Sequence, residues 1–227
     1  ELEEMMNKPC FINCGLCVAK DEARDYTQAL QQEDHALKTV APEDLNWAEG
    51  LETDDEGYIL AYPDGSAIDT QSRLTARAGW AVHYGKNSKH NAADALRGPV
   101  KSSFRAEARA VAHVVSTAVL PTHIKSDCKG VVMLLNKLNL DREADIGEWP
   151  EGDIWEAIRN RLPDGNTEFF RSTRIPSHLG ESGKDKLLQE AIEKGIITPA
   201  DVVGNDEADK LAKGTLKHEE IPPKILQ

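Results

Sequence analysis

Residues 102–127 read SSFRAEARAVAHVVSTAVLPTHIKSD, and this stretch decides the fold. Ser102 or Ser103 is the expected N-cap of a helix. The apolar residues of one helical face are Phe104, Ala108, Val111, Val115 and Val119. After Pro121, the segment 122–127 predicts a short strand that ends in an aspartate. A helix that leads directly into a strand indicates that helices and a sheet pack together in one domain.

The residues before this stretch predict strands. Short apolar runs bounded by glycines and a P-D-G-S turn predict strands at 58–62 and 76–85, and a weaker third strand is expected at 92–100. The residues after it alternate between the two kinds of element. Helices are predicted at 128–138 and 153–162, with a strand at 167–178. This order predicts a mixed sheet covered by helices.

The last third of the chain predicts two more helices. Residues 179–203 look like an insertion that contains a helix closing at Gly195. The final helix is predicted at 204–214, with Gly214 placed to stop it.

Composition limits the class of protein. The chain has 227 residues, of which 40% are hydrophobic and 29% are charged, enough for one sizeable core. No stretch approaches the roughly 18 apolar residues of a membrane helix, and the first residues do not resemble a signal peptide. We therefore expect a soluble intracellular protein, cytoplasmic or nuclear, that has no membrane partner.

Charge divides the chain near Gly57. The net charge is −12, and residues 1–57 hold 15 acidic residues against 4 basic ones, which leaves a charge of −1 for residues 58–227. We expect an acidic segment and linker at 1–57, a domain at 58–216 and a tail at 217–227. The acidic segment either competes with a bound polyanion or is a solvated linker. Because the domain itself is nearly neutral, its charge does not exclude a nucleic-acid partner.

Three of the four cysteines lie close together, at Cys10, Cys14 and Cys17. Their spacing matches the cluster loop of radical enzymes that use S-adenosylmethionine, but the segment is too short for the barrel of such enzymes. The alternatives are a zinc site completed by His35, or reduced thiols on a short apolar segment.

Four carboxylates fall at informative places. Asp64 is expected just beyond the first strand, Glu107 in the first turn of the first helix, Asp127 at a strand end and Asp209 in the last helix. Each alone could be a helix cap or a solvated surface acid. Strand ends and helix starts share one rim of an α/β sheet, so the four carboxylates can meet there.

Five motifs in order resemble a known family. The motifs are P-D-G-S at 63–66, R-A-E at 105–107, I-K-S-D-C at 124–128, I-P-S-H at 175–178 and G-N-D-E-A-D-K-L-A at 204–212. Together they are similar to the motif set of the ribonuclease H family, of type 1 and retroelement kind, over about residues 58–216. The resemblance implies an α/β fold with a five-stranded mixed sheet, three antiparallel strands and then two parallel ones, with helices on both faces.

The resemblance also implies an activity, which is endonucleolytic cleavage of the RNA strand of RNA–DNA hybrids with two Mg²⁺ ions, for which Mn²⁺ can substitute. Asp64, Glu107, Asp127 and Asp209 would be the metal ligands, and His178 would help proton transfer or product release. His178 stands 31 positions before Asp209 rather than the family's ten or so, which weakens its assignment. A retroelement origin would add reverse transcriptase or other polyprotein domains as partners.

The residue types suit this chemistry. Two metal ions serve the attacking water and the leaving oxygen of a phosphodiester, and Mg²⁺ prefers carboxylate oxygens. Cys128 is therefore not expected to bind it. The candidate nucleic-acid contacts are Ser66, Ser103, Phe104, Arg105, Lys129 and Asn205, with further cations at Lys86, Lys89 and Lys101. The loop around Trp149 is acidic, so we expect weak, salt-sensitive binding.

Two other functions remain open. The domain could be a non-catalytic module that binds nucleic acid, although the presence of all four carboxylates favours an enzyme. It could also be a DNA-processing nuclease of the same superfamily, although the R-A-E and G-N-D-E-A-D motifs favour a ribonuclease.

Overall fold

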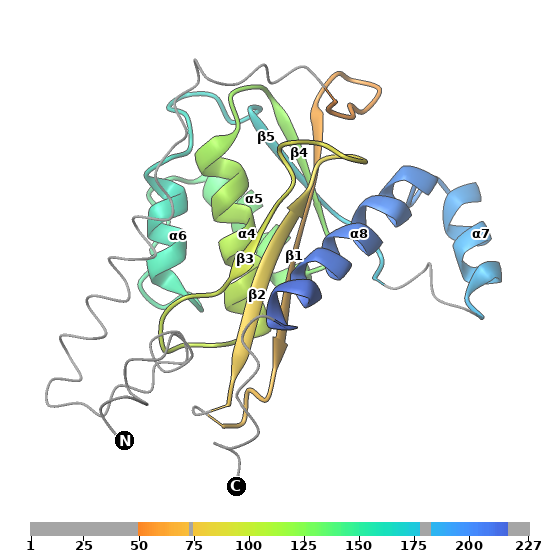
Figure 1. Ribbon diagram of the computed structural model, residues 1–227. Coiled ribbons are helices and arrows are strands. Elements are labelled where there is room, and N and C mark those ends of the chain that lie inside the picture. Colours follow the sequence, from red (N-terminus) through yellow and green to blue (C-terminus); the bar gives the residue numbers. More distant parts are fainter. Residues whose placement is uncertain (1–49, 73–74, 178–182, 218–227) are drawn as a thin grey trace, which may run out of the picture.

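The computed structural model describes residues 50–72, 75–177 and 183–217, and they contain a five-stranded mixed sheet (Figure 1). The strand order is β3-β2-β1-β4-β5, where β1 to β3 are antiparallel, β4 is parallel to β1 and β5 is parallel to β4. The strands are β1 Ile59–Ile68, β2 Arg77–His83, β3 Ala92–Ala95, β4 Thr122–Ser126 and β5 Phe170–Arg174. This is the predicted sheet, and the predicted fold class is confirmed.

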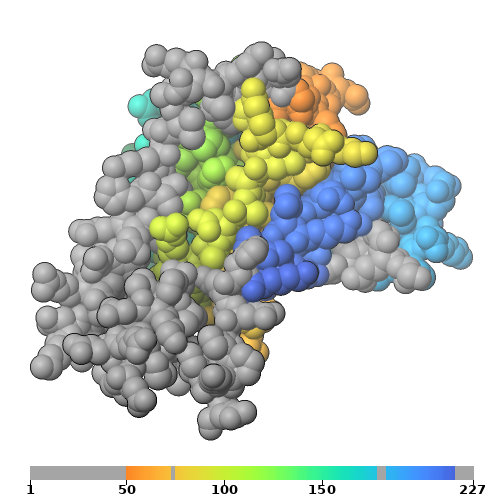
Figure 2. Space-filling model, viewed as in Figure 1, coloured from red at the N-terminus to blue at the C-terminus, as the bar shows by residue number. Residues whose placement is uncertain are grey.

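Helices lie on both sides of the sheet (Figure 1). The helices are α4 Ser103–Thr117, α5 Lys129–Leu140, α6 Gly152–Arg159, α7 Asp185–Glu193 and α8 Pro199–Leu216. The first three share one face and the larger core, whereas α8 packs on the other face. Figure 2 shows α8 (blue) lying along the strands β2 and β3 (yellow), with α7 (light blue) beyond its first turn.

Side chains of β1 alternate between the two cores, as the two-residue period of a strand requires. Ile59 and Ala61 belong to the larger core, and Leu60 and Tyr62 belong to the smaller core under α7 and α8. Both faces of β1 are therefore buried, which fixes its register against β2 and β4.

The strand β1 is longer than predicted. The P-D-G-S motif is part of the strand rather than a turn, since Pro63 and Gly65 pair with Val82 and Trp80 of β2. The pairing of β1 with β4 covers only Ile59–Ala61. Beyond that point no strand of the described residues pairs with this edge of β1, so a proline can be accommodated there.

The last helix is also longer than predicted. It begins at Pro199, because Thr198 and Asp201 form a capping box and Pro199 occupies the first turn. It continues through Gly214 to the buried Leu216, so the prediction that Gly214 stops the helix was wrong.

The predicted insertion helix is present as α7, and Gly195 follows its end with a φ of 64°. The strands β3 and β5 are shorter than predicted.

Residues just before the predicted boundary at Gly57 contact the sheet. Leu51 packs against the larger core, the amide of Leu60 donates to the carbonyl of Glu52, and Asp54 Oδ2 lies 2.9 Å from His123 Nδ1. The boundary itself stays a prediction. The cysteine cluster at 10–17 and the end of the C-terminal tail lie outside the described residues. Over the described part of the chain, none of the helices has both the length and the apolar character needed to cross a membrane.

Candidate metal centre

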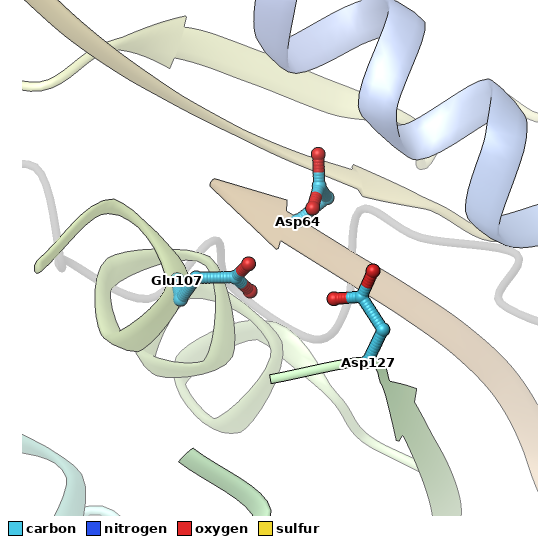
Figure 3. A group of neighbouring side chains, drawn as sticks. All are labelled: Asp64, Glu107 and Asp127. Atoms are coloured by element: carbon cyan, nitrogen blue, oxygen red, sulfur yellow. The ribbon is translucent and has the colours of Figure 1, made fainter. Parts of the chain in front are cut away.

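Three carboxyl groups converge beside the inner strands β1 and β4, at the end of β4. Asp64 comes from β1, Glu107 from α4 and Asp127 from the residue after β4, and the three side chains point toward one another (Figure 3). Each offers one oxygen, and these oxygens all lie within 4.8 Å of one another. We call these three residues the carboxylate cluster.

The sheet creates the place for this cluster. In the sheet, β2 and β3 lie on one side of β1, whereas β4 and β5 lie on the other side. Ligands of α/β sheets commonly bind where the strand order changes side in this way, which here is between β1 and β4. Asp64 and Asp127 both lie beyond the three residues over which β1 pairs with β4. The cluster therefore stands where the pairing between these two strands has ended.

A glycine lets α4 approach β1 closely enough to bring in Glu107. A Cβ atom on Gly65 would lie 2.3 Å from the Glu107 amide nitrogen and 2.6 Å from the Ala106 carbonyl carbon. Real Cβ atoms do not approach backbone atoms so closely, and only glycine permits this contact.

Glu107 is not in the first turn of α4, so that prediction was wrong. Ser102 is the N-cap, and its Oγ accepts a hydrogen bond of 3.0 Å from the Arg105 amide. Because the helix begins directly after this cap, at Ser103, Glu107 falls in its second turn. The side chain of Glu107 is 7% exposed. The helix dipole, which acts within the first turn, does not explain a buried acid at this position.

Burial and mutual repulsion raise the pKa values of Asp64 and Glu107. Burial, with the negative charges of Asp127 and Asp209, raises the pKa of Asp64 to about 6. Burial, followed by the charge of Asp64, raises the pKa of Glu107 well above its usual value. Among the described residues, Asp64 Oδ2 and Glu107 Oε2 are buried without a hydrogen-bond partner. Buried acceptors without donors fit a bound cation.

We expect the metal-free protein to lose stability as the pH rises through the titration of Asp64. An aspartate has a pKa of 3.8 when unfolded and here about 6 when folded, so the native state binds the proton more tightly. The stability gained in this way is complete below about pH 4 and is lost as the pH approaches and passes 6. Two pKa units correspond to about 3 kcal/mol.

Asp64→Asn has no carboxyl group at this position and should not lose stability in this way. The difference between its melting temperature and that of the parent should therefore increase from pH 4 to pH 7. Thermal melts in metal-free buffers measure it. A difference that stays constant with pH would contradict the raised pKa.

Asp209 lies next to the cluster rather than within its 4.8 Å group. It stands on α8, close enough for its charge to contribute to the raised pKa of Asp64. Its Oδ2 accepts a hydrogen bond of 2.8 Å from Lys213 Nζ, and its side chain is 28% exposed. The structure thus brings three of the four predicted ligands together and places the fourth beside them.

A buried network, which the sequence analysis missed, anchors α8. Asp201 Oδ1 accepts hydrogen bonds from the hydroxyl of Tyr62 at 3.0 Å and from Lys125 Nζ at 2.7 Å. One turn later lies Asn205, one of the predicted nucleic-acid contacts. It is 5% exposed, and its buried Oδ1 has no partner among the described residues. The T-P-A-D sequence at 198–201 is a recognisable helix start and could have indicated Asp201.

Arg105 was predicted to contact nucleic acid, and this prediction was wrong. Its side chain is 6% exposed, and its Nη1 lies 2.6 Å from Glu151 Oε2 and 2.9 Å from Asp153 Oδ1. Glu151, the N-cap of α6, and Asp153, in the first turn of α6, thus neutralise it and join the starts of α4 and α6. Lys101 is also buried and donates to the carbonyl of Leu96. Neither cation is available to phosphate.

Arg105→Met should destabilise the fold by roughly 3 kcal/mol, since it strands two carboxylates that are partly buried. Urea denaturation measures the change. Arg97→Met is the matched control, because Arg97 is 53% exposed and its pair with Asp94 should contribute at most about 1 kcal/mol. Equal effects of the two substitutions would show that the Arg105 cluster is not a structural clamp.

The other predicted contact residues differ in exposure. Ser103 and Lys129 are exposed, Ser66 is half-buried, and Phe104 is half-buried against Gly130 at the start of α5. Lys86 and Lys89 are exposed in the loop after β2, at the edge of the sheet where β1 begins, which is away from Asp64. His178 lies outside the described residues.

No protein-family model matches the chain, and no curated protein matches it. The solved structures to which it is similar include the RNase H domain of PFV, at 17% identity and a TM-score of 0.48, over 70% of this chain and 94% of that one. They also include RNase H1 from the halophilic archaeon Halobacterium salinarum NRC-1, at 17% identity and a TM-score of 0.36, over 71% of this chain and 99% of that one.

Both solved structures carry the name RNase H, the family that the motif order resembles.

Proposed function

We propose that this protein is a magnesium-dependent endoribonuclease that cleaves the RNA strand of RNA–DNA hybrids. The observation that carries the proposal is the carboxylate cluster, with two buried oxygens that accept no hydrogen bond from any residue the structure describes. The choice of hybrid as substrate is supported by the order of the five motifs.

The ligand set suits two divalent cations of the Mg²⁺ type. Asp64, Glu107 and Asp127 supply only oxygen donors, and hard cations prefer these. Asp209 on the neighbouring helix adds a fourth carboxylate. When bound, a pair of Mg²⁺ ions supplies an activated water and stabilises the leaving oxygen of a phosphodiester. Mn²⁺, which accepts the same ligands, should substitute.

The side chains of this chain hold their positions through burial. Asp64 and Glu107 are 6% and 7% exposed, so their rotamers are restricted by packing and their charges act in a poorly solvated site. Asp127 and Asp209 are half-buried and can face the substrate from the solvent side. The carboxylate cluster and Asp209 together thus provide a rigid inner pair and an accessible outer pair.

A panel of labelled substrates tests the proposal. RNA–DNA hybrid, single-stranded RNA, duplex RNA and duplex DNA are incubated with the protein in Mg²⁺ or in EDTA. We expect cleavage of the RNA strand of the hybrid, in Mg²⁺ alone. Cleavage of duplex DNA would indicate a DNA-processing nuclease, and binding of hybrid without cleavage would indicate a non-catalytic module. Either result, or cleavage in EDTA, would overturn the proposal.

A further inference from the structure

We propose that Arg174 and Lys129 form a phosphate-binding pair that holds the nucleic-acid backbone next to the carboxylate cluster. The proposal extends the function proposed above and rests on it. It assigns a role to Arg174, the last residue of β5, and gives Lys129 a partner.

The sheet register places Arg174 beside the cluster. Arg174 pairs with Ser126 of β4, the residue directly before Asp127. Neighbouring strands are about 4.8 Å apart, so the two backbones are adjacent at this edge. β4 separates Arg174 from Asp64, and the arginine therefore flanks the cluster on its β5 side.

The alternation of β5 places Arg174 near the start of α5. Ser172 faces α5, since its hydroxyl donates to Asn136 Oδ1 at 2.8 Å, and Arg174 two residues later lies on the same face. Two strand residues span about 6.6 Å, and one turn of helix spans about 5.4 Å. The carbonyl of Val132 in α5 lies 3.5 Å from Ser172 Oγ. The residues one helical turn before Val132 are Cys128 and Lys129. The two cations therefore stand at the same level of the sheet.

Both side chains are exposed, and within the described residues neither forms an ion pair with a carboxylate. Other cations near this rim are engaged. Arg105 is buried between two acids, and Lys125 is bound to Asp201. On the same strand, Arg171 lies on the opposite face and pairs with Glu56 at 2.6 Å. Arg174 and Lys129 are thus placed to meet an external anion.

The two cations can offset the repulsion between the carboxylate cluster and a negatively charged substrate. A polyanion that approaches the carboxylate cluster is repelled by it, and cations beside the cluster offset the repulsion. Successive phosphates of one strand follow at about 3.4 Å along the helix axis. A strand with its scissile phosphate at Asp127 therefore brings further phosphates within reach of a long arginine or lysine side chain. Such contacts position the backbone and read no sequence.

Salt dependence tests the pair. Arg174→Gln, Lys129→Gln and the double variant are compared with the parent. Lys194→Gln is the matched control, because it removes the same charge from an exposed side chain at the end of α7. KM and kcat for hybrid cleavage are measured from 50 to 200 mM KCl. The dissociation constant of hybrid is measured in the same range, with each substitution placed in Asp127→Asn so that the hybrid stays intact.

We expect each single variant to weaken binding by roughly 3- to 10-fold at 100 mM salt with kcat unchanged. The slope of log affinity against log salt should fall by about one for each cation removed and by about two for the double variant. Slopes equal to those of Lys194→Gln, or a loss confined to kcat, would overturn the inference. Failure of the parent to cleave hybrid would instead refute the proposed function, and the binding measurements would still decide whether the pair holds a backbone.

Discussion

Asp127→Asn should lower hybrid cleavage by at least about 10²-fold and leave the metal-free protein as stable as the parent, or more stable. Losses of 10- to 100-fold are typical when even an outer partner of a metal ligand is removed, so a ligand should cost at least the upper end. The stability of the metal-free protein should not fall, because Asp127 is one of the negative charges that raise the pKa of Asp64 by repulsion. Asparagine keeps the shape and removes that charge.

Paired thermal melts, with and without millimolar Mg²⁺, test the second half of this expectation beside the cleavage assay. Mg²⁺ should raise the melting temperature of the parent more than that of Asp127→Asn, through preferential binding to the folded state. Asp164→Asn, at an exposed turn, is the control and should match the parent in both assays. An active Asp127→Asn would exclude this residue from the site. A variant much less stable without metal would make Asp127 a structural residue.

Gly65→Ala should remove cleavage and the response to Mg²⁺ together. Its Cβ would meet backbone atoms of Ala106 and Glu107, which cannot rotate away. α4 would have to move away from β1 and carry Glu107 out of the cluster. Over-packing of this kind typically costs 1–3 kcal/mol, and the rigid contact here places the expected loss at about 3 kcal/mol or more.

Gly130→Ala is the matched control for that substitution. Its new Cβ would lie 2.8 Å from Phe104 Cε2, the far end of a side chain that can shift. We expect a smaller loss of stability and an intact response to Mg²⁺, measured by thermal melts in both variants. Equal behaviour of the two variants would show that the close approach of α4 to β1 does not position Glu107.

The sequence predicted those parts of the site that depend on local pattern. Asp127 follows a clear strand, and its place at the strand end was predicted correctly. The helix cap was narrowed to Ser102 or Ser103, and the structure shows that it is Ser102. The position of Asp64 inside β1 was missed, because P-D-G-S is typical of a turn and only the pairing with β2 keeps it extended. The strand's free edge, which tolerates Pro63, is a property of the sheet and not of the motif.

Burial of charge was the harder part to predict. Arg105 looked like a phosphate contact because its neutralising partners are 46 and 48 positions away in the chain. Lys125 and Asp201 are separated by 76 positions. Ion pairs between distant segments leave no periodic signal in a single sequence. The partners of these charged residues can be identified only once the sheet order has placed the segments side by side.

The end of the β1–β4 pairing has a consequence for folding. The cluster draws Asp64, Glu107 and Asp127 from segments that are joined only when β4 has crossed over to pair with β1, a contact of high sequence separation. Closing loops of this length costs chain entropy before any contact is gained, and such topologies fold slowly. On the function proposed above, affinity for a divalent cation would therefore arise only after β4 has paired with β1. A refolding chain that binds the ion would already have formed the β1–β4 pairing, so metal binding would report the formation of this contact during folding.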